Sequence, residues 1–85
     1  DLSQADLRGA DLRWAYLRAA DLKQANLTGA NLVGCDLSNV DLSGATLNKA
    51  DLQGANLHKS RVTKSQLARN KSLKGAILPD GARHK

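Results

Sequence analysis

Aromatic residues and methionine are nearly absent from this chain of 85 residues, which has no Phe or Met, one Trp and one Tyr. Small domains ordinarily take much of their buried area from such side chains. The apolar residues still make up 41% of the sequence, and almost all of them are Leu and Ala. A core of many similar, modest contacts indicates a repetitive interior, and this length suffices for one small domain.

Other absences exclude whole classes of protein. Cys35 is the single cysteine, so the chain has no intrachain disulfide framework, and Cys35 cannot form a metal cluster by itself. No apolar run approaches the roughly 18 residues of a membrane span. The basic, amphipathic pattern of a signal or transit peptide is missing too, so no compartment is predicted. Because the chain begins at Asp1 in the middle of its pattern, we expect a fragment or a processed product.

Apolar residues recur with a period of five. Leucine stands at every fifth position from Leu2 to Leu57, and Val62 continues the series. Two residues before each leucine there is usually an alanine, and the residue between them is nearly always Asp or Asn, so the unit is Ala-(Asp/Asn)-Leu-x-x. Such a period indicates a repeat protein. We expect the structural core to contain Leu7, Leu12, Leu17, Leu22, Leu27, Leu32, Leu37, Leu42, Leu47, Leu52 and Leu57.

A period of five fits neither regular element. On an α-helix successive leucines would drift around the cylinder, and on a strand every other leucine would face the wrong side. The pattern works if each unit is a short extended piece followed by a corner, with Ala and Leu pointing inward and the Asp or Asn between them outward. Glycine often stands at the second position after Leu, where a tight corner needs a positive φ. Corners that always bend the same way wind the chain into stacked coils.

The segments ADLRG, ADLKQANLTGANLVG and ADLQGANLHKS resemble the pentapeptide-repeat family, and the resemblance covers residues 1 to about 62. It implies an all-β fold, a right-handed quadrilateral β-helix with four pentapeptides per coil, and so about three coils in this solenoid. The later segment SLKGAILPDG resembles the closing segment of many such domains, especially those of cyanobacteria.

The register changes after Val62. Thr63 and Gln66 have the spacing of a capping box, which predicts a short helix over residues 64 to 70. The alternative is one more pentapeptide, because Leu67 is still in frame. We therefore expect a solenoid over 1–62, a C-terminal cap over 63–81 and a disordered tail over 82–85. With no cap before Asp1, the N-terminal end is either an open edge or covered by another segment.

The residues that carry chemistry favour structural roles. All eight acids are Asp, and seven of them occupy the outward repeat position, where we expect them to satisfy turn and backbone groups. His58 and His84 have no Cys, Ser or acid at a spacing that suggests a triad or metal site. Cys35 replaces an inward Ala, so it is a buried small residue or, alternatively, a reactive thiol. We predict no catalytic, cofactor-binding or metal residues and no enzyme activity.

Trp14 and Tyr16 both point outward in this scheme and have two interpretations. The indole could lie on the column of Gly34 and Gly54 in its own solenoid. Alternatively the aromatic residues are binding anchors, since Trp, Tyr and Arg are enriched in binding hot spots. The candidate interaction surface consists of Arg13, Trp14, Tyr16 and Arg18.

Positive charge gathers in the C-terminal third, where residues 59 to 85 carry eight bases against Asp80 alone. The candidate basic patch consists of Lys59, Arg61, Lys64, Arg69, Lys71 and Lys74. A solvated cap is one interpretation, and attraction to an acidic partner, nucleic acid or an anionic surface is the other. The patch has no interleaved aromatic residues, so stacking on single-stranded bases is unsupported.

The sequence therefore favours a non-catalytic structural or protein-interaction scaffold with an unidentified protein partner. The alternative function is binding of a polyanion through the basic C-terminal third. A third possibility comes only from the resemblance, because some pentapeptide-repeat proteins imitate DNA and bind type II topoisomerases. That activity is associated with long acidic solenoids, whereas this chain is short and has a formal charge of +5.

Overall fold

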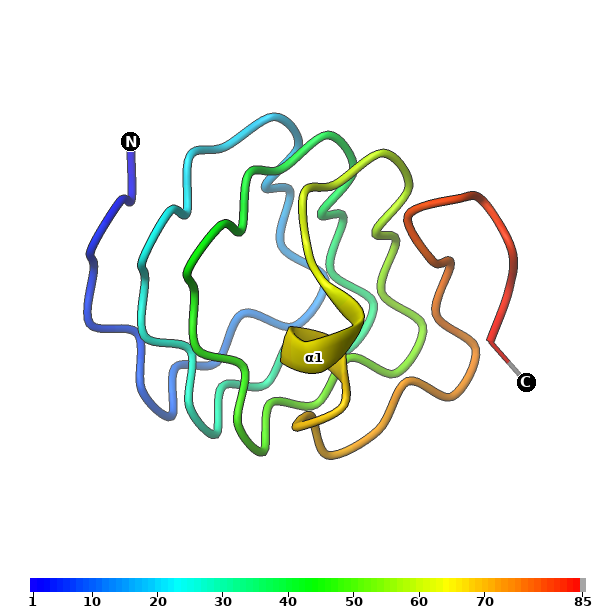
Figure 1. The fold of residues 1–85 in the computed structure, drawn as a ribbon. Coiled ribbons are helices and arrows are strands. Elements are labelled where there is room, and N and C mark those ends of the chain that lie inside the picture. The colour runs from blue at the N-terminus through cyan, green and yellow to red at the C-terminus, as the bar shows by residue number, and fades with distance from the viewer. Residues whose placement is uncertain (85) are drawn as a thin grey trace.

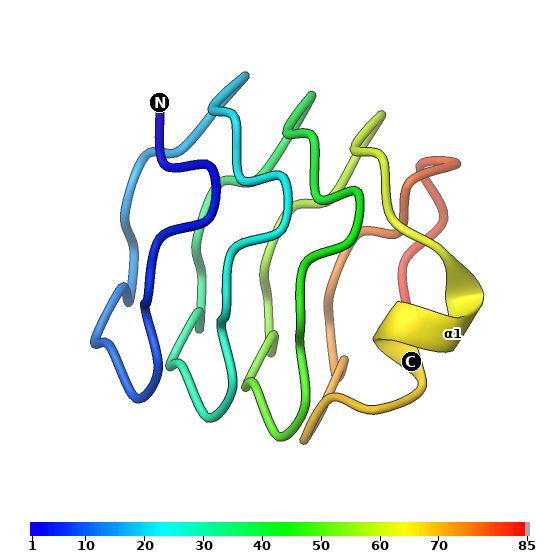
Figure 2. The ribbon, with the colours of Figure 1, turned by 60° about the vertical axis from the view of Figure 1, so that its left-hand side comes forward.

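The computed structural model describes residues 1–84, and the chain in it winds as successive coils along one axis (Figure 1). Seen from the side, the coils stack one after another, with the N-terminus at one end and the C-terminal segment at the other (Figure 2). Parallel bridges join residues 20 apart, as in the series Asp6, Asn26 and Thr46. Twenty residues therefore make one coil, and equivalent residues of successive coils lie in columns.

Each side of a coil is one five-residue unit, and between residues 6 and 40 every side makes three backbone hydrogen bonds to the next coil. On one side, the N–H of Leu7 donates to the carbonyl of Asn26 at 2.8 Å, and the N–H of Gly9 donates to Thr28 at 2.9 Å. The third bond runs back from the N–H of Asn26 to the carbonyl of Ala5, at 2.9 Å. The bridges are isolated, so within the described residues the ladders contain no longer strand.

Every unit ends in a tight corner. The N–H of Ala10, for example, donates to the carbonyl of Leu7 at 3.0 Å, which closes a four-residue turn. The third residue of each turn from Gln4 to Lys59 has a φ between 59° and 71°. Glycine adopts this conformation freely, whereas Trp14 and six other non-glycine residues adopt it against their steric preference.

The core is a stack of leucines flanked by small residues. Eight of the expected core leucines are 0–1% exposed, namely Leu22, Leu27, Leu32, Leu37, Leu42, Leu47, Leu52 and Leu57. The other three, Leu7, Leu12 and Leu17, are only partly buried and pack against this cluster from the first coil. Burial of one such side chain contributes roughly 1.5–3 kcal/mol before conformational entropy is subtracted, so the stability is shared along the stack.

Helix α1, Lys64–Leu67, interrupts the ladder after the third coil. Thr63 and Gln66 form the capping box: Oγ1 of Thr63 accepts from the N–H of Gln66 at 3.1 Å, and Oε1 of Gln66 accepts from the N–H of Thr63 at 2.8 Å. The helix is shorter than the 64–70 expected, because Ala68 is its C-cap and the chain turns back to the ladder. Beyond α1 the columns continue one residue out of step, with bridges 21 residues apart such as Asp51 to Ser72.

The last described residues differ from the disordered tail expected over 82–85. Arg83 forms an antiparallel bridge with Ile77, and the N–H of Gly75 donates to the carbonyl of His84 at 2.9 Å. The N–H of His84 in turn donates to Ala76 at 2.7 Å. Residues 82–84 thus fold back because the final turn offers them unpaired backbone groups, while Lys85 lies outside the described residues. The boundaries at 62 and 81 stay predictions.

Candidate interaction surface

The outward Asp and Asn side chains hold the corners of the repeat. Oδ1 of Asp21 accepts a hydrogen bond from the N–H of Lys23 at 3.0 Å, and Oδ1 of Asn26 accepts one from Thr28 at 3.1 Å. The same bond recurs in most other units. Short polar side chains favour such turns because they bond locally to the backbone. These carboxylates therefore have a structural role that accounts for their spacing.

The first two arginines are paired within their own units. Arg8 donates from Nε and Nη2 to the two carboxylate oxygens of Asp6, at 2.8 and 2.7 Å. Arg13 makes the same fork with Asp11, at 2.9 and 2.8 Å. The side-chain bond from Arg8, helped by its backbone N–H, lowers the pKa of Asp6 from 3.8 to about 2, and the pKa of Asp11 is lowered for the same reason. Arg13 is therefore exposed but already engaged.

Tyr16 breaks the outward pattern. It stands where neighbouring units have Asp or Asn, so no short side chain accepts from the N–H of Arg18, and that N–H bonds to none of residues 1–84. Arg18 also lacks an acid within its own unit, and its Nε lies 3.8 Å from Oδ2 of Asp36 on the next coil. Tyr16 is 82% exposed. The ring therefore adds nothing to the core at a position where the fold favours Asp or Asn.

Trp14 lies on its own solenoid and is also exposed. Its φ is +62°, a conformation that bulky residues rarely adopt. The indole lies over Gly34, because a Cβ built on that glycine would come within 2.1 Å of Cε3 and Cζ3 of the ring. Trp14 is nevertheless 75% exposed, so it rests on its own solenoid and still presents most of its surface outward. The contact does not extend to Gly54, which has no indole atom near its Cβ position.

Among the described residues, the first coil packs against the second coil only, and its other end is uncovered. Its four leucines are partly exposed: Leu2, Leu7, Leu12 and Leu17. From Asn26 to Arg61 the N–H of each outward residue donates to the preceding coil, whereas the N–H groups of Asp6, Asp11, Tyr16 and Asp21 donate to none of the described residues. Unpaired ladder groups beside apolar side chains are a template for pairing with another segment.

The six residues of the candidate basic patch are all exposed but lie around the cap. Arg61 forms a parallel backbone bridge with Asp41 on one side of the solenoid, and α1 carries Lys64 over the next side. The ladder partners of their segments place Lys71 and Lys74 on the third side and Lys59 at a corner of the fourth. Ser43 lowers the pKa of Asp41 most, with Arg61 contributing. The structure thus spreads this charge around the cap instead of gathering it on one face.

Cys35 lies in the core with no exposed surface. Burial, with the nearby Asp36 carboxylate adding to it, raises the pKa of the thiol to about 11. The thiol is therefore protonated at neutral pH, which favours the buried small residue over a reactive group. Residues 1–84 contain no group of three or more His, Cys, Asp or Glu that could hold a metal ion. No helix in this range is long and apolar enough to cross a membrane.

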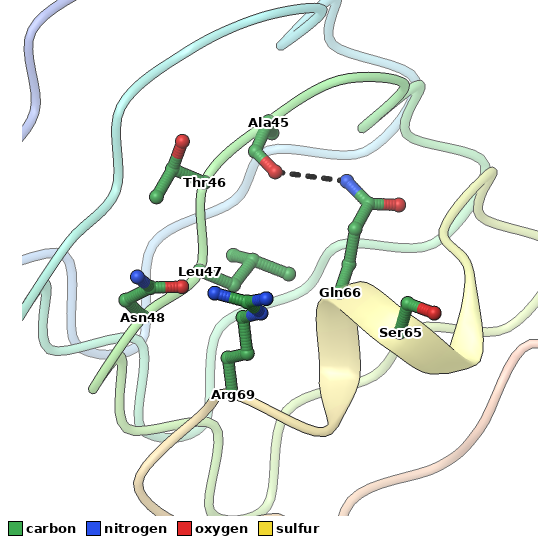
Figure 3. A pocket seen from close by; sticks show the side chains of 7 residues that line it. All are labelled: Ala45, Thr46, Leu47, Asn48, Ser65, Gln66 and Arg69. Carbon is green, nitrogen blue, oxygen red and sulfur yellow. Dashed lines mark hydrogen bonds between the residues drawn. The ribbon is translucent and has the colours of Figure 1, made fainter.

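A groove beside α1 is a feature that sequence reasoning did not find (Figure 3). Gln66 lies at its upper edge, where Nε2 donates to the carbonyls of Ala45 and Leu42 at 2.9 and 2.7 Å. Arg69 rises from the segment after α1 beside Leu47. The one signal in the sequence is Thr46, which, like Tyr16 and Arg61, stands at an outward position where the other units carry Asp or Asn.

Stacked five-residue units, buried leucine columns and outward acids that bond to the following turn define a pentapeptide solenoid. The family model for pentapeptide repeats, found in 8 copies, matches residues 1–34, 20–58 and 35–69. The chain therefore belongs to the pentapeptide repeat family. The solved structures of its relatives imply that this chain forms a right-handed quadrilateral β-helix.

Several solved structures are similar to the chain. HetL, a pentapeptide repeat protein involved in heterocyst differentiation regulation from the cyanobacterium Nostoc sp. strain PCC 7120, is 41% identical over 91% of this chain and 40% of HetL, with a TM-score of 0.59. QnrB1, a plasmid-mediated fluoroquinolone resistance protein, is 23% identical over 92% of this chain and 36% of its own, with a TM-score of 0.79.

The third structure is alr5209, a pentapeptide repeat protein from Nostoc PCC 7120, which is 40% identical over 92% of this chain and 64% of its own, with a TM-score of 0.46. The chain thus spans well under half the length of HetL and QnrB1. No curated protein sequence matches the chain closely enough to add a relative.

Proposed function

We propose that this chain is a non-catalytic, rigid protein-interaction module that binds a protein partner through its first coil. Trp14, Tyr16 and Arg18 are the contacts. The observation that carries this proposal is Tyr16, an 82% exposed ring where the repeat favours a short acid or amide. A residue that the fold does not need, of a type enriched in hot spots, indicates selection for binding.

Trp14 supports the same surface. Its left-handed backbone disfavours a bulky side chain, yet the indole remains 75% exposed. Gly34 supports one face of the ring and so limits its motion before a partner binds. A preorganised aromatic anchor loses less conformational entropy on association than a mobile one. Arg18 adds a guanidinium that only a long contact to Asp36 engages.

The stacked coils make a suitable scaffold because each side between residues 6 and 40 makes three backbone hydrogen bonds to the next coil. Pentapeptide repeat proteins are generally structural or interaction proteins. The relative HetL has a regulatory role, which a binding protein without catalytic residues can perform. The present chain spans 40% of HetL.

Site-specific photocrosslinking tests this proposal. A benzoylphenylalanine is placed at Tyr16 in cells that express the chain, and at the outward position of Asn26 as the matched control. We expect one protein to crosslink from position 16 but not from 26, and the purified pair to bind saturably with little dependence on salt. Trp14→Gly should weaken that binding by about tenfold, as loss of a hot-spot aromatic does. Equal crosslinking from both positions, or unchanged binding by Trp14→Gly, would contradict it.

Polyanion binding through the C-terminal third is the alternative, supported by eight bases against one acid in residues 59–85. It requires an affinity for duplex DNA or heparin that falls steeply as salt is raised. Charge reversal at Lys64, Arg69 and Lys71 should then remove binding. An affinity that barely changes with salt would exclude this alternative.

Imitation of DNA at a topoisomerase is a weaker candidate. A DNA mimic presents uncompensated negative charge, whereas Asp6, Asp11 and Asp21 lie within 4 Å of basic groups and the chain has a formal charge of +5. The similarity to QnrB1, at 23% identity, extends to the fold alone. A gyrase supercoiling assay checks this point, and inhibition by the purified chain would favour the mimic.

A further inference from the structure

The groove beside α1 has a lining of mostly polar residues from two parts of the chain. One wall is the solenoid side of Ala45, Thr46, Leu47 and Asn48, and the other is formed by Ser65, Gln66 and Arg69. Its volume is about 390 Å³, within the range of small-ligand sites. Figure 3 shows the Arg69 guanidinium beside Leu47 and Asn48, with Gln66 reaching Ala45 above them.

The ladder hydrogen bonds on this side of the solenoid are incomplete. A regular next coil would provide three: one to the carbonyl of Ala45, one from the N–H of Leu47 and one from the N–H of Lys49. The first is replaced by Nε2 of Gln66, which donates to Ala45 at 2.9 Å. The third is made, because the N–H of Lys49 donates to the carbonyl of Arg69 at 2.8 Å. The second is missing, since the N–H of Leu47 donates to none of the described residues.

This unpaired donor is unusual because Leu47 is 1% exposed. Buried backbone N–H groups are nearly always paired, and an unpaired one is destabilising by about 1–3 kcal/mol. The carbonyl of Gln66, which the regular ladder would offer, instead accepts from the N–H groups at the end of α1. An acceptor that enters the groove from outside would complete the ladder.

The charge of the lining identifies the acceptor. Arg69 forms no ion pair with any of residues 1–84, and no Asp or Glu lines the groove. Thr46, Ser65 and Asn48 add hydroxyl and amide donors. A carboxylate can accept from a backbone N–H with one oxygen and from a guanidinium with the other, in charge-assisted hydrogen bonds.

We infer that the groove between α1 and residues 45–48 binds an organic carboxylate, held by the N–H of Leu47 and the guanidinium of Arg69. The carboxylate can belong to a small acid or to an acidic side chain of a bound peptide, since both present the same group. This site is separate from the first coil and lies near the opposite end of the solenoid. The carboxylate site can therefore be tested independently of the proposed partner of Trp14 and Tyr16.

The experiment follows the Leu47 amide by ¹⁵N NMR of the full chain. Two probes are titrated, glutarate and the peptide acetyl-Ala-Glu-Ala-amide, with glutaramide and the Gln peptide as uncharged controls. We expect the Leu47 amide to shift saturably with at least one acid and with neither amide. The tighter of the two acids identifies the source of the carboxylate. A Leu47 amide that moves with neither acid, or equally with the amides, would overturn the inference.

Two variants separate this site from general electrostatic attraction. Arg69→Gln removes the guanidinium while the backbone bond from Lys49 is kept, and we expect it to weaken carboxylate binding by about tenfold. Lys64→Gln removes the same charge from α1 outside the groove, and we expect no change. An equal loss in both variants would contradict the site. Arg69→Lys, which keeps the charge without the planar fork, should give an intermediate affinity.

Discussion

The indole of Trp14 rests on the backbone of Gly34, its column neighbour on the next coil. A Cβ on Gly34 would lie 2.1 Å from Cε3 and Cζ3 of the ring, so no larger residue fits beneath it. The contact explains how a 75% exposed tryptophan is held in one orientation. It also makes the indole a built-in reporter, because it is the one tryptophan in the sequence.

Gly34→Ala should displace this indole, which gives the first prediction. Tryptophan fluorescence should become more accessible to a soluble quencher, and the free energy of unfolding should fall. Gly29→Ala is the matched control, since Gly29 has a φ of +68° against +67° at Gly34 but nothing within 4 Å of its Cβ position. Both variants should lose about 1–2 kcal/mol through the left-handed backbone, with Gly34→Ala losing more. Identical quenching in the two variants would contradict the contact.

Two buried serines should respond in opposite directions to removal of the hydroxyl. Ser60 and Ser38 are both 8% exposed. Oγ of Ser60 has no hydrogen-bond partner among the described residues, whereas Oγ of Ser38 donates to Oδ1 of Asp36 at 2.7 Å. Ser60→Ala should therefore raise the free energy of unfolding by about 1 kcal/mol, and Ser38→Ala should lower it by a similar amount. Urea denaturation measures both, and a loss of stability in Ser60→Ala would show that its hydroxyl is satisfied.

Of the residues in the cap, Gln66 should contribute most to the free energy of unfolding. Its side chain accepts from Thr63 and donates to the carbonyls of Leu42 and Ala45, so it joins α1 to the third coil. Gln66→Ala should destabilise the chain by about 2 kcal/mol, since three hydrogen bonds are lost. Ser65→Ala, at an exposed neighbour, is the control and should change stability by less than about 0.5 kcal/mol. Equal stability of the two variants would mean that α1 is not anchored by this side chain.

Acid should weaken the solenoid through its outward carboxylates. The pKa of Asp6 is lowered from 3.8 to about 2 in the folded chain, and those of Asp11 and Asp41 are lowered as well. A lowered carboxyl pKa stabilises the fold above pH 3.8, and this stability is lost as the pH falls toward 2. We expect the urea midpoint to decrease across that range.

The double variant Asp6→Asn with Asp11→Asn tests the source of this pH dependence. Asn occupies the same position in other units, where Asn26 and Asn31 accept the turn hydrogen bond, so the corners should persist. The variant should show a shallower loss of stability in acid because two of the titrating groups are gone. An unchanged acid profile would place the dependence on other groups.

The inward columns could be predicted from the sequence because they depend on local alternation alone. A five-residue period fixes which of the Leu and Ala side chains share the interior, whatever the details of the coils. The capping box of Thr63 and Gln66 is equally local, since its two bonds span three residues. The end of α1 at Leu67 is not a local feature, because it depends on where the chain rejoins the ladder at Lys49.

Features that depend on contacts between distant residues could not be predicted. The bond from Gln66 to Leu42 joins residues 24 apart in the sequence, and the pairing of His84 with Ala76 requires the last turn to be in place. The composition of residues 82–84 alone suggests disorder for that reason. Trp14 is a further case: the spacing to Gly34 predicted the contact, but not that the indole would remain mostly exposed.

If Tyr16 is retained for binding against the preference of the fold, Tyr16→Asn should increase the free energy of unfolding. Asn should restore the turn bond to the N–H of Arg18 that Asn26 and Asn56 make in their units, without adding a charge beside Asp36. Tyr16→Ala is the control that removes the ring without adding an acceptor.

We expect Tyr16→Asn to be more stable than the natural chain by about 1 kcal/mol, and more stable than Tyr16→Ala by a similar margin. If Tyr16→Asn is instead less stable than the natural chain, the ring supports the solenoid itself, and the argument for an interaction surface on the first coil is lost.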